Sequence, residues 1–125
     1  MNLFKERVMD MAETYELKLQ PQFFNYIKYG TKRIEIRLYD EKRQKIKVGD
    51  EIIFLKEPSL DEKLKVRVVK LIKCKSFEEL IEKFEISILA DKSMTKSELL
   101  MKLEKFYTKE NQKKYGVVGI RLELA

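Results

Sequence analysis

The chain has 125 residues, of which 44% are hydrophobic and 38% are charged, and its formal net charge is +6. This length suits one domain, and the hydrophobic share is enough for a packed core, which excludes a disordered tail. A single cysteine and the lack of histidine exclude an intramolecular disulfide, a Cys/His zinc site and histidine-based catalysis. We expect no metal, no cofactor, no membrane segment and a cytoplasmic location.

The first part of the chain predicts a helix, a strand and a second helix. Residues 3–12 have apolar positions at helical spacing, which indicates a short amphipathic helix or a frayed terminus in an extension over residues 1–13. Residues 14–19 alternate apolar and polar side chains as a strand does. Pro21 suits the first position of a helix, and Gly30 suits the left-handed residue that ends it.

The segment after this helix is the most informative part of the sequence. Residues 33–39 alternate charged and apolar side chains, which predicts a strand with one charged face and one apolar face. Lys32, Glu35 and Arg37 then converge at one end of the strand and make a candidate site for a polar or anionic ligand. The alternative is a half-buried strand whose outer face is solvated and salt-bridged.

A basic loop follows this strand. Residues 40–47 are polar and include Lys42, Arg43, Lys45 and Lys47, which are candidate contacts for RNA phosphates. The basic excess of the chain is concentrated from Lys28 to Lys47, on the charged strand and in this loop, which is compatible with nucleic-acid binding. The alternative is a solvated loop without a ligand.

The remainder predicts three strands and two helices. Residues 51–55 suit a central strand, residues 57–62 a hairpin loop, and residues 64–73 a strand with a β-bulge near Val68 or with both faces buried. Two Ser/Thr-x-x-Glu capping boxes, at residues 76–79 and 95–98, begin helices, and the second helix runs through Tyr107. Residues 109–114 are polar, and residues 117–124 form a closing strand. Sequential short strands favour a small barrel or rolled sheet.

One motif in this order resembles a known family. The pattern Gly30-x-Lys32-x-x-Glu35-x-Arg37 is similar to the signature of the ASCH domain, a relative of the PUA RNA-binding fold. The resemblance covers residues 15–124, including a Val-Gly-Asp turn before an apolar strand and a Tyr-Gly-Val-Val-Gly-Ile segment near the end. It implies one ASCH/PUA-like domain over residues 1–125. It also implies an α+β fold, a small PUA-like β-barrel of about five to six mostly antiparallel strands with helices packed on it.

The resemblance implies a cleft between barrel and helices that binds RNA, a nucleotide or a modified nucleoside. The motif residues would line it, with Tyr107 from the last helix as a further ligand contact. Tyr39 and Phe54 are other candidate stacking groups. The resemblance leaves the oligomeric state open. A regulatory or structural domain with an unused cleft is the blandest alternative.

A hydrolase is the competing function, either an amidohydrolase of N-acetylated cytidine or a ribonuclease. Family members of the first kind use a Lys, a Thr and a Glu. The Lys falls on Lys32, and the Glu falls on Glu98, so that Lys32, Glu35 and Glu98 are the candidate catalytic residues. Glu35 stands where those enzymes have Thr, and a carboxylate cannot form the same covalent intermediate as a hydroxyl. The alternative for Glu98 is that it only caps its own helix.

Overall fold

The computed structural model describes residues 12–125, so the expected N-terminal helix lies outside the described residues. Within this range no helix combines the length and the apolar character needed to cross a membrane. The elements follow one another as β1 (Thr14–Leu19), α2 (Pro21–Lys28), β2 (Ile34–Leu38), the 3-10 turn η1 (Arg43–Lys45), β3 (Glu51–Lys56), β4 (Lys63–Cys74), α3 (Phe77–Glu82), α4 (Ile86–Leu89), α5 (Lys96–Phe106), α6 (Lys109–Tyr115) and β5 (Val117–Leu124).

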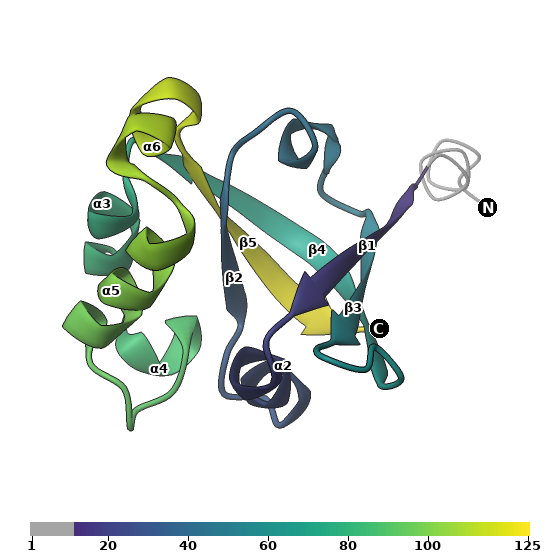
Figure 1. Ribbon diagram of the computed structural model, residues 1–125. Coiled ribbons are helices and arrows are strands. Elements are labelled where there is room, and N and C mark those ends of the chain that lie inside the picture. The colour runs from purple at the N-terminus through teal and green to yellow at the C-terminus, as the bar shows by residue number, and fades with distance from the viewer. Residues whose placement is uncertain (1–11) are drawn as a thin grey trace.

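The five strands form one curved sheet in the order β1-β3-β4-β5-β2. Strands β1 and β3 are parallel, and the other three neighbouring pairs are antiparallel. Helices α3 to α6 stand together beside β2, and α2 lies apart from them (Figure 1). The architecture is a mostly antiparallel half-barrel with helices packed on it, which confirms the predicted α+β fold class. Strands β1 and β2 are the two edges of this sheet.

The predicted turn chemistry is confirmed at the ends of α2 and before β3. Pro21 occupies the start of α2, where its missing N–H costs no hydrogen bond. Gly30 has φ +85° and Gly49 has φ +96°, a region that side chains with a Cβ rarely adopt. The predicted bulge is confirmed as a register shift between Val68 and Lys70 in the pairing of β4 with β5.

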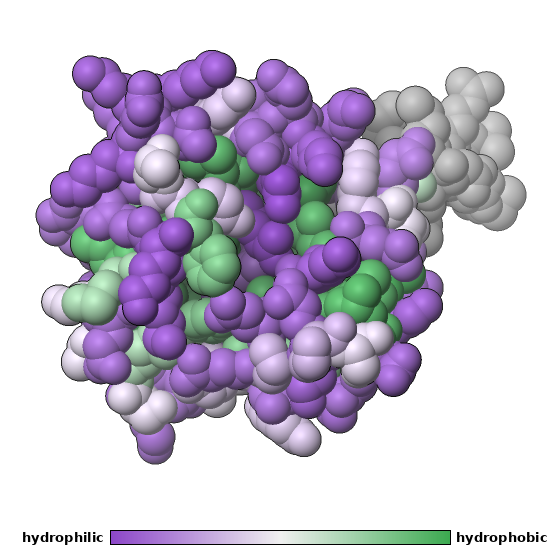
Figure 2. Space-filling view, in the orientation of Figure 1, coloured by the Kyte–Doolittle hydropathy of each residue, from purple (hydrophilic) through white to green (hydrophobic). Residues whose placement is uncertain are grey.

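The core has two parts, one inside the half-barrel and one between the sheet and the helices. Phe54 is fully buried in the first part, and Phe77 is fully buried in the second. Burial of these rings removes apolar surface from water and stabilises the fold. Phe54 therefore belongs to the core and is not available for stacking on a ligand. Hydrophilic side chains cover most of the face seen in Figure 2, and the hydrophobic ones gather there in separate patches.

Two helices had no recognisable pattern in the sequence. Helix α4 is a single turn, which is too short for a periodicity to be recognised. Helix α6 is polar along its length, but Thr108 caps its first turn. Gln112 anchors it, because its buried side chain accepts a 3.0 Å hydrogen bond from the backbone of Phe77 and donates one of 3.1 Å to Glu104.

Candidate functional site

The charged face of β2 is buried rather than solvated. All five residues of β2 are buried, and the exposed fractions of Lys32, Glu35 and Arg37 are only 3%, 5% and 9%. The alternative interpretation, a half-buried strand with a solvated outer face, is therefore wrong. Elements from other parts of the chain meet these charges, since the Leu89 carbonyl of α4 contacts Lys32 and the Lys18 carbonyl of β1 contacts Arg37.

Lys32 is held by acceptors from three directions. Its Nζ donates to the backbone carbonyls of Ile34 and Leu89, each at 2.6 Å, and lies 3.3 Å from Oε1 of Glu35. These acceptors occupy the donors of the ammonium group. Lys32 thereby connects β2 with α4, and it has no remaining N–H for a reacting oxyanion.

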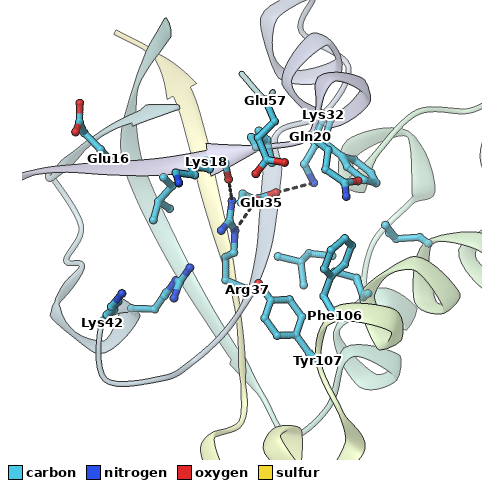
Figure 3. A pocket seen from close by; sticks show the side chains of 17 residues that line it. Glu16, Lys18, Gln20, Lys32, Glu35, Arg37, Lys42, Glu57, Phe106 and Tyr107 are labelled. Carbon is cyan, nitrogen blue, oxygen red and sulfur yellow. Dashed lines mark hydrogen bonds and ion pairs between the residues drawn. The ribbon is translucent and has the colours of Figure 1, made fainter. Parts of the chain in front are cut away.

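Glu35 and Arg37 form the second half of the same charge cluster. Nε of Arg37 lies 2.7 Å from Oε2 of Glu35, and its Nη2 donates to the carbonyl of Lys18 in β1 at 2.8 Å. A guanidinium has more N–H donors than these two bonds use. Arg37 therefore keeps hydrogen-bonding capacity toward the space that it lines (Figure 3).

The electrostatics of the cluster hold Glu35 ionised. Burial acts to raise the pKa of Glu35, but the charges of Arg37 and Lys32 outweigh it and lower this pKa below its usual value. Burial lowers the pKa of Lys32 although Glu35 opposes the change. Burial also acts against the charge of Arg37, but Glu35 and then Tyr107 raise its pKa. Glu35 is accordingly a weak base.

A cleft of about 510 Å³ lies in front of this cluster. Strands β1 and β2, the basic loop and the end of α5 all contribute to its walls (Figure 3). Its polar lining includes Lys18, Gln20, Lys42 and Glu57 besides the three motif residues. Its volume is within the range of pockets that enclose small ligands.

One wall of the cleft is aromatic and apolar. Phe23 from α2, Phe106 and Tyr107 from the end of α5, and Leu99 and Leu103 from the same helix line it. Phe106 is 65% exposed, although it is a large apolar side chain. The sequence predicted Tyr107 at this site and missed Phe23 and Phe106, because helical spacing assigns such residues to the core.

The basic loop divides into two parts with different positions. Lys42 and Arg43 line the cleft, and Arg43 also pairs with Asp40 at 2.9 Å. Nε of Arg43 is buried and has no hydrogen-bond partner within residues 12–125. Lys45 and Lys47 are exposed and are not among the residues that line this cleft.

Other candidate residues lie outside the cleft. Glu98 is exposed, and its carboxylate accepts a 3.1 Å hydrogen bond from the backbone of Thr95, which completes a capping box. The structure therefore gives Glu98 the capping role and does not bring it to Lys32.

Gly30 turns the chain so that Lys32 N donates to the carbonyl of Tyr26 at 3.0 Å. Tyr39 packs on the barrel core, and Nζ of Lys73 lies 4.9 Å from its ring centre.

Comparisons with known proteins agree with this architecture. The crystal structure of the hypothetical protein PH0355 matches with a TM-score of 0.80 and 42% identity, over 90% of this chain and 99% of that chain. The solution structure of protein PF0455 from Pyrococcus furiosus matches with a TM-score of 0.71 and 40% identity, over 89% and 96% of the two chains. No curated protein matches. The family model of the ASCH domain matches residues 17–125, and the chain therefore belongs to the ASCH domain family, which has a PUA-like fold.

Proposed function

We propose that the cleft binds single-stranded RNA by enclosing one of its nucleotides. The PUA-like fold is generally linked to RNA binding, which gives the proposal its starting point. The observation that carries it is the polarity of the cleft, which has cationic groups at one end and aromatic rings along one wall (Figure 3). A nucleotide has the same division, since its phosphate is anionic and its base is a flat ring.

The cationic end suits a phosphate. Arg43 lines the cleft, and its guanidinium has N–H donors beyond the one that pairs with Asp40 at 2.9 Å. Arg37 has N–H donors that its two bonds do not use, and Lys42 adds an exposed positive charge to the lining of the cleft. These three cations support binding of a phosphate oxygen between β2 and the basic loop.

The aromatic wall suits a base. Phe106 and Tyr107 are adjacent in the chain, and their ring centres are 6.5 Å apart. A base that stacks on an exposed aromatic ring gains about 1–3 kcal/mol. Burial of Phe106 by a ligand would also remove the unfavourable exposure of a large apolar ring.

Binding agrees with the geometry better than hydrolysis does. The proposed hydrolytic reaction needs Lys32 to stabilise an oxyanion and a carboxylate to activate water. The donors of Lys32 are occupied by Ile34, Leu89 and Glu35, and Glu35 is held as a weak base. Glu98 lies outside the cleft.

A matched pair of variants on α5 tests the proposal. Phe106 and Met101 are 65% and 63% exposed, so that truncation to Ala removes a similarly exposed apolar side chain, but only Phe106 lines the cleft. We expect Phe106→Ala to weaken binding of a short single-stranded RNA about tenfold or more, measured by calorimetry or fluorescence anisotropy. Met101→Ala should bind like the unchanged protein. Equal affinities for the two variants, or no RNA binding by the unchanged protein, would refute the proposal.

A further inference from the structure

The cleft occupies the seam where the barrel does not close. Strands β1 and β2 are the two edges of the sheet, and no backbone ladder joins them. Both strands nevertheless line the same cleft, β1 through residues 16–19 and β2 through residues 35–37. The direct connection across this seam is the 2.8 Å hydrogen bond from Arg37 to the carbonyl of Lys18. The backbone of each edge strand can therefore face the ligand.

The register of β1 shows which of its backbone groups face the cleft. Glu51 N donates to the carbonyl of Glu13, and Glu57 N donates to the carbonyl of Leu19, each at 2.9 Å, so the odd-numbered residues bond to β3. Alternate residues of a strand direct both their N–H and their C=O to the same side. The N–H and C=O groups of Glu16 and Lys18 consequently point away from β3. The bond between the Lys18 carbonyl and Arg37 agrees with this direction.

The same argument applies to β2. Tyr39 N donates to Gly116 O at 3.0 Å, and Leu122 N donates to Arg33 O at 2.9 Å, so the odd-numbered residues of this segment bond to β5. The backbone of Ile34 and Ile36 therefore faces the seam. Lys32 occupies the carbonyl of Ile34 at 2.6 Å. Arg37 and Lys32 thus occupy one carbonyl on each edge, and the neighbouring backbone groups remain directed into the cleft.

We propose that the main chain of β1 reads the base of the bound nucleotide, with the Glu16 carbonyl as acceptor and the Lys18 N–H as donor. This inference rests on the proposed function. The Watson–Crick edge of a base presents hydrogen-bond donors and acceptors next to one another, and proteins read this edge in single-stranded RNA. An open strand edge offers the complementary groups at fixed positions. With its edge on β1, the base has the aromatic residues of α5 on the adjoining wall and the cations of the basic loop toward its phosphate (Figure 3).

A small planar ligand fits this seam better than an added peptide strand does. A peptide strand would need to pair along the length of β1. The Arg37 guanidinium interrupts that path, because it bonds to the carbonyl of Lys18. A base needs only a short part of the edge. This mode of recognition also predicts that methylation of the ring nitrogen on the Watson–Crick edge abolishes binding, because the methyl group replaces a hydrogen bond with a clash.

Proline substitution tests the main-chain contact directly. The Lys18 N–H does not pair with β3, so Lys18→Pro removes this donor and leaves the β1–β3 ladder intact. Lys18→Ala is the matched control, because it removes the same side chain and keeps the N–H. We expect Lys18→Pro to bind the tightest of the four nucleoside 5′-monophosphates about tenfold more weakly than Lys18→Ala does, and this comparison separates the loss of the N–H from the loss of the side chain.

Two further measurements do not depend on the folding of the proline variant. The Lys18 amide proton should exchange more slowly with solvent when the unchanged protein is saturated with that nucleotide, and its ring-methylated counterpart should not bind. If the nucleotide binds with the expected dependence on Phe106 but Lys18 exchange and the methylated ligand show no effect, the main-chain contact is refuted and the proposed function stands. If none of the monophosphates or short RNAs binds, both proposals fail.

Discussion

Lys32 stabilises the fold of the site because it satisfies acceptors on two elements. We predict that Lys32→Met lowers the free energy of unfolding by about 3 kcal/mol or more, since it leaves the Glu35 charge with one partner and two buried carbonyls without a donor. Urea denaturation followed by circular dichroism measures this loss. Lys28→Met is the control, because Lys28 pairs with Glu62 at the surface and its loss should have a far smaller effect. Equal losses for the two variants would contradict the role of Lys32.

Glu35 should give the protein an acid-sensitive component of stability. Its pKa in the folded protein is lowered from 4.5, so between the two pKa values the unfolded chain binds more protons than the folded one. This contribution is therefore complete above pH 4.5 and is lost as the pH falls through the folded pKa. We expect Glu35→Gln to be less stable than the unchanged protein near neutral pH, with a difference that shrinks on acidification. Chemical unfolding across that range measures it, and a constant difference would contradict the prediction.

The sequence could predict that Lys32, Glu35 and Arg37 lie close together, but it could not predict that they are buried. Lys32, Glu35 and Arg37 are close in the chain, and the two-residue period of a strand places Glu35 and Arg37 on one face. The groups that enclose them come from remote positions. Two of them are the backbone carbonyls of Leu89 and Lys18, for which no side-chain type gives a signal.

At the level of elements, the capping box at the start of α5 allows the structural role of Thr95 and Glu98 to be tested separately from a catalytic role of Glu98. We predict that Thr95→Ala lowers the free energy of unfolding by about 1 kcal/mol, because Thr95 accepts a hydrogen bond from Glu98 N. Thr108→Ala removes the equivalent cap of α6 and should have a similar effect. Thermal and urea melts of both variants measure it. An unchanged stability after Thr95→Ala would mean that this capping box does not contribute.

The same helix end provides a test of Glu98. Glu98→Gln keeps an acceptor for Thr95 N and removes only the charge, so we expect nearly unchanged stability and unchanged RNA affinity. If a hydrolytic activity disappears in this variant while stability is retained, Glu98 takes part in the reaction and is more than a helix cap. Circular dichroism and an assay for acetate release from acetylated cytidine distinguish these outcomes.

Elements with a local signal could be predicted, and those held by distant contacts could not. Alternation of apolar and polar residues predicted β1, β2 and β4, and a nearly continuous apolar run predicted β3. Proline, glycine and Thr-x-x-Glu signals placed the ends of α2 and the start of α5. Helix α6 is polar, and its attachment depends on Gln112, whose partners Phe77 and Glu104 lie on two other helices. No pattern within residues 109–115 carries that information.

For the whole molecule, the proposed RNA binding predicts different roles for the charge around the open seam and for the charge elsewhere. The net charge is +6, and only part of the basic loop that contributes to it reaches the cleft. Lys42 and Arg43 line it, whereas Lys45 and Lys47 are exposed elsewhere on the same loop. The four residues thus form two pairs of equal charge and different position. Variants of the two pairs can therefore test which cations contact the phosphates in the proposed RNA complex.

We predict that the double variant Lys42→Gln/Arg43→Gln weakens RNA binding at low salt and flattens its salt dependence, because each lost phosphate contact on a single strand removes about 0.7 from the slope of log K against log salt. The variant Lys45→Gln/Lys47→Gln changes the net charge equally and should leave most of the slope unchanged. Binding measured at several salt concentrations gives both slopes, and melting curves verify that loss of the Arg43–Asp40 pair has not unfolded the loop. Equal reductions in the two variants would mean that RNA senses the overall charge. A larger reduction for the Lys45/Lys47 pair would place the phosphates outside the cleft.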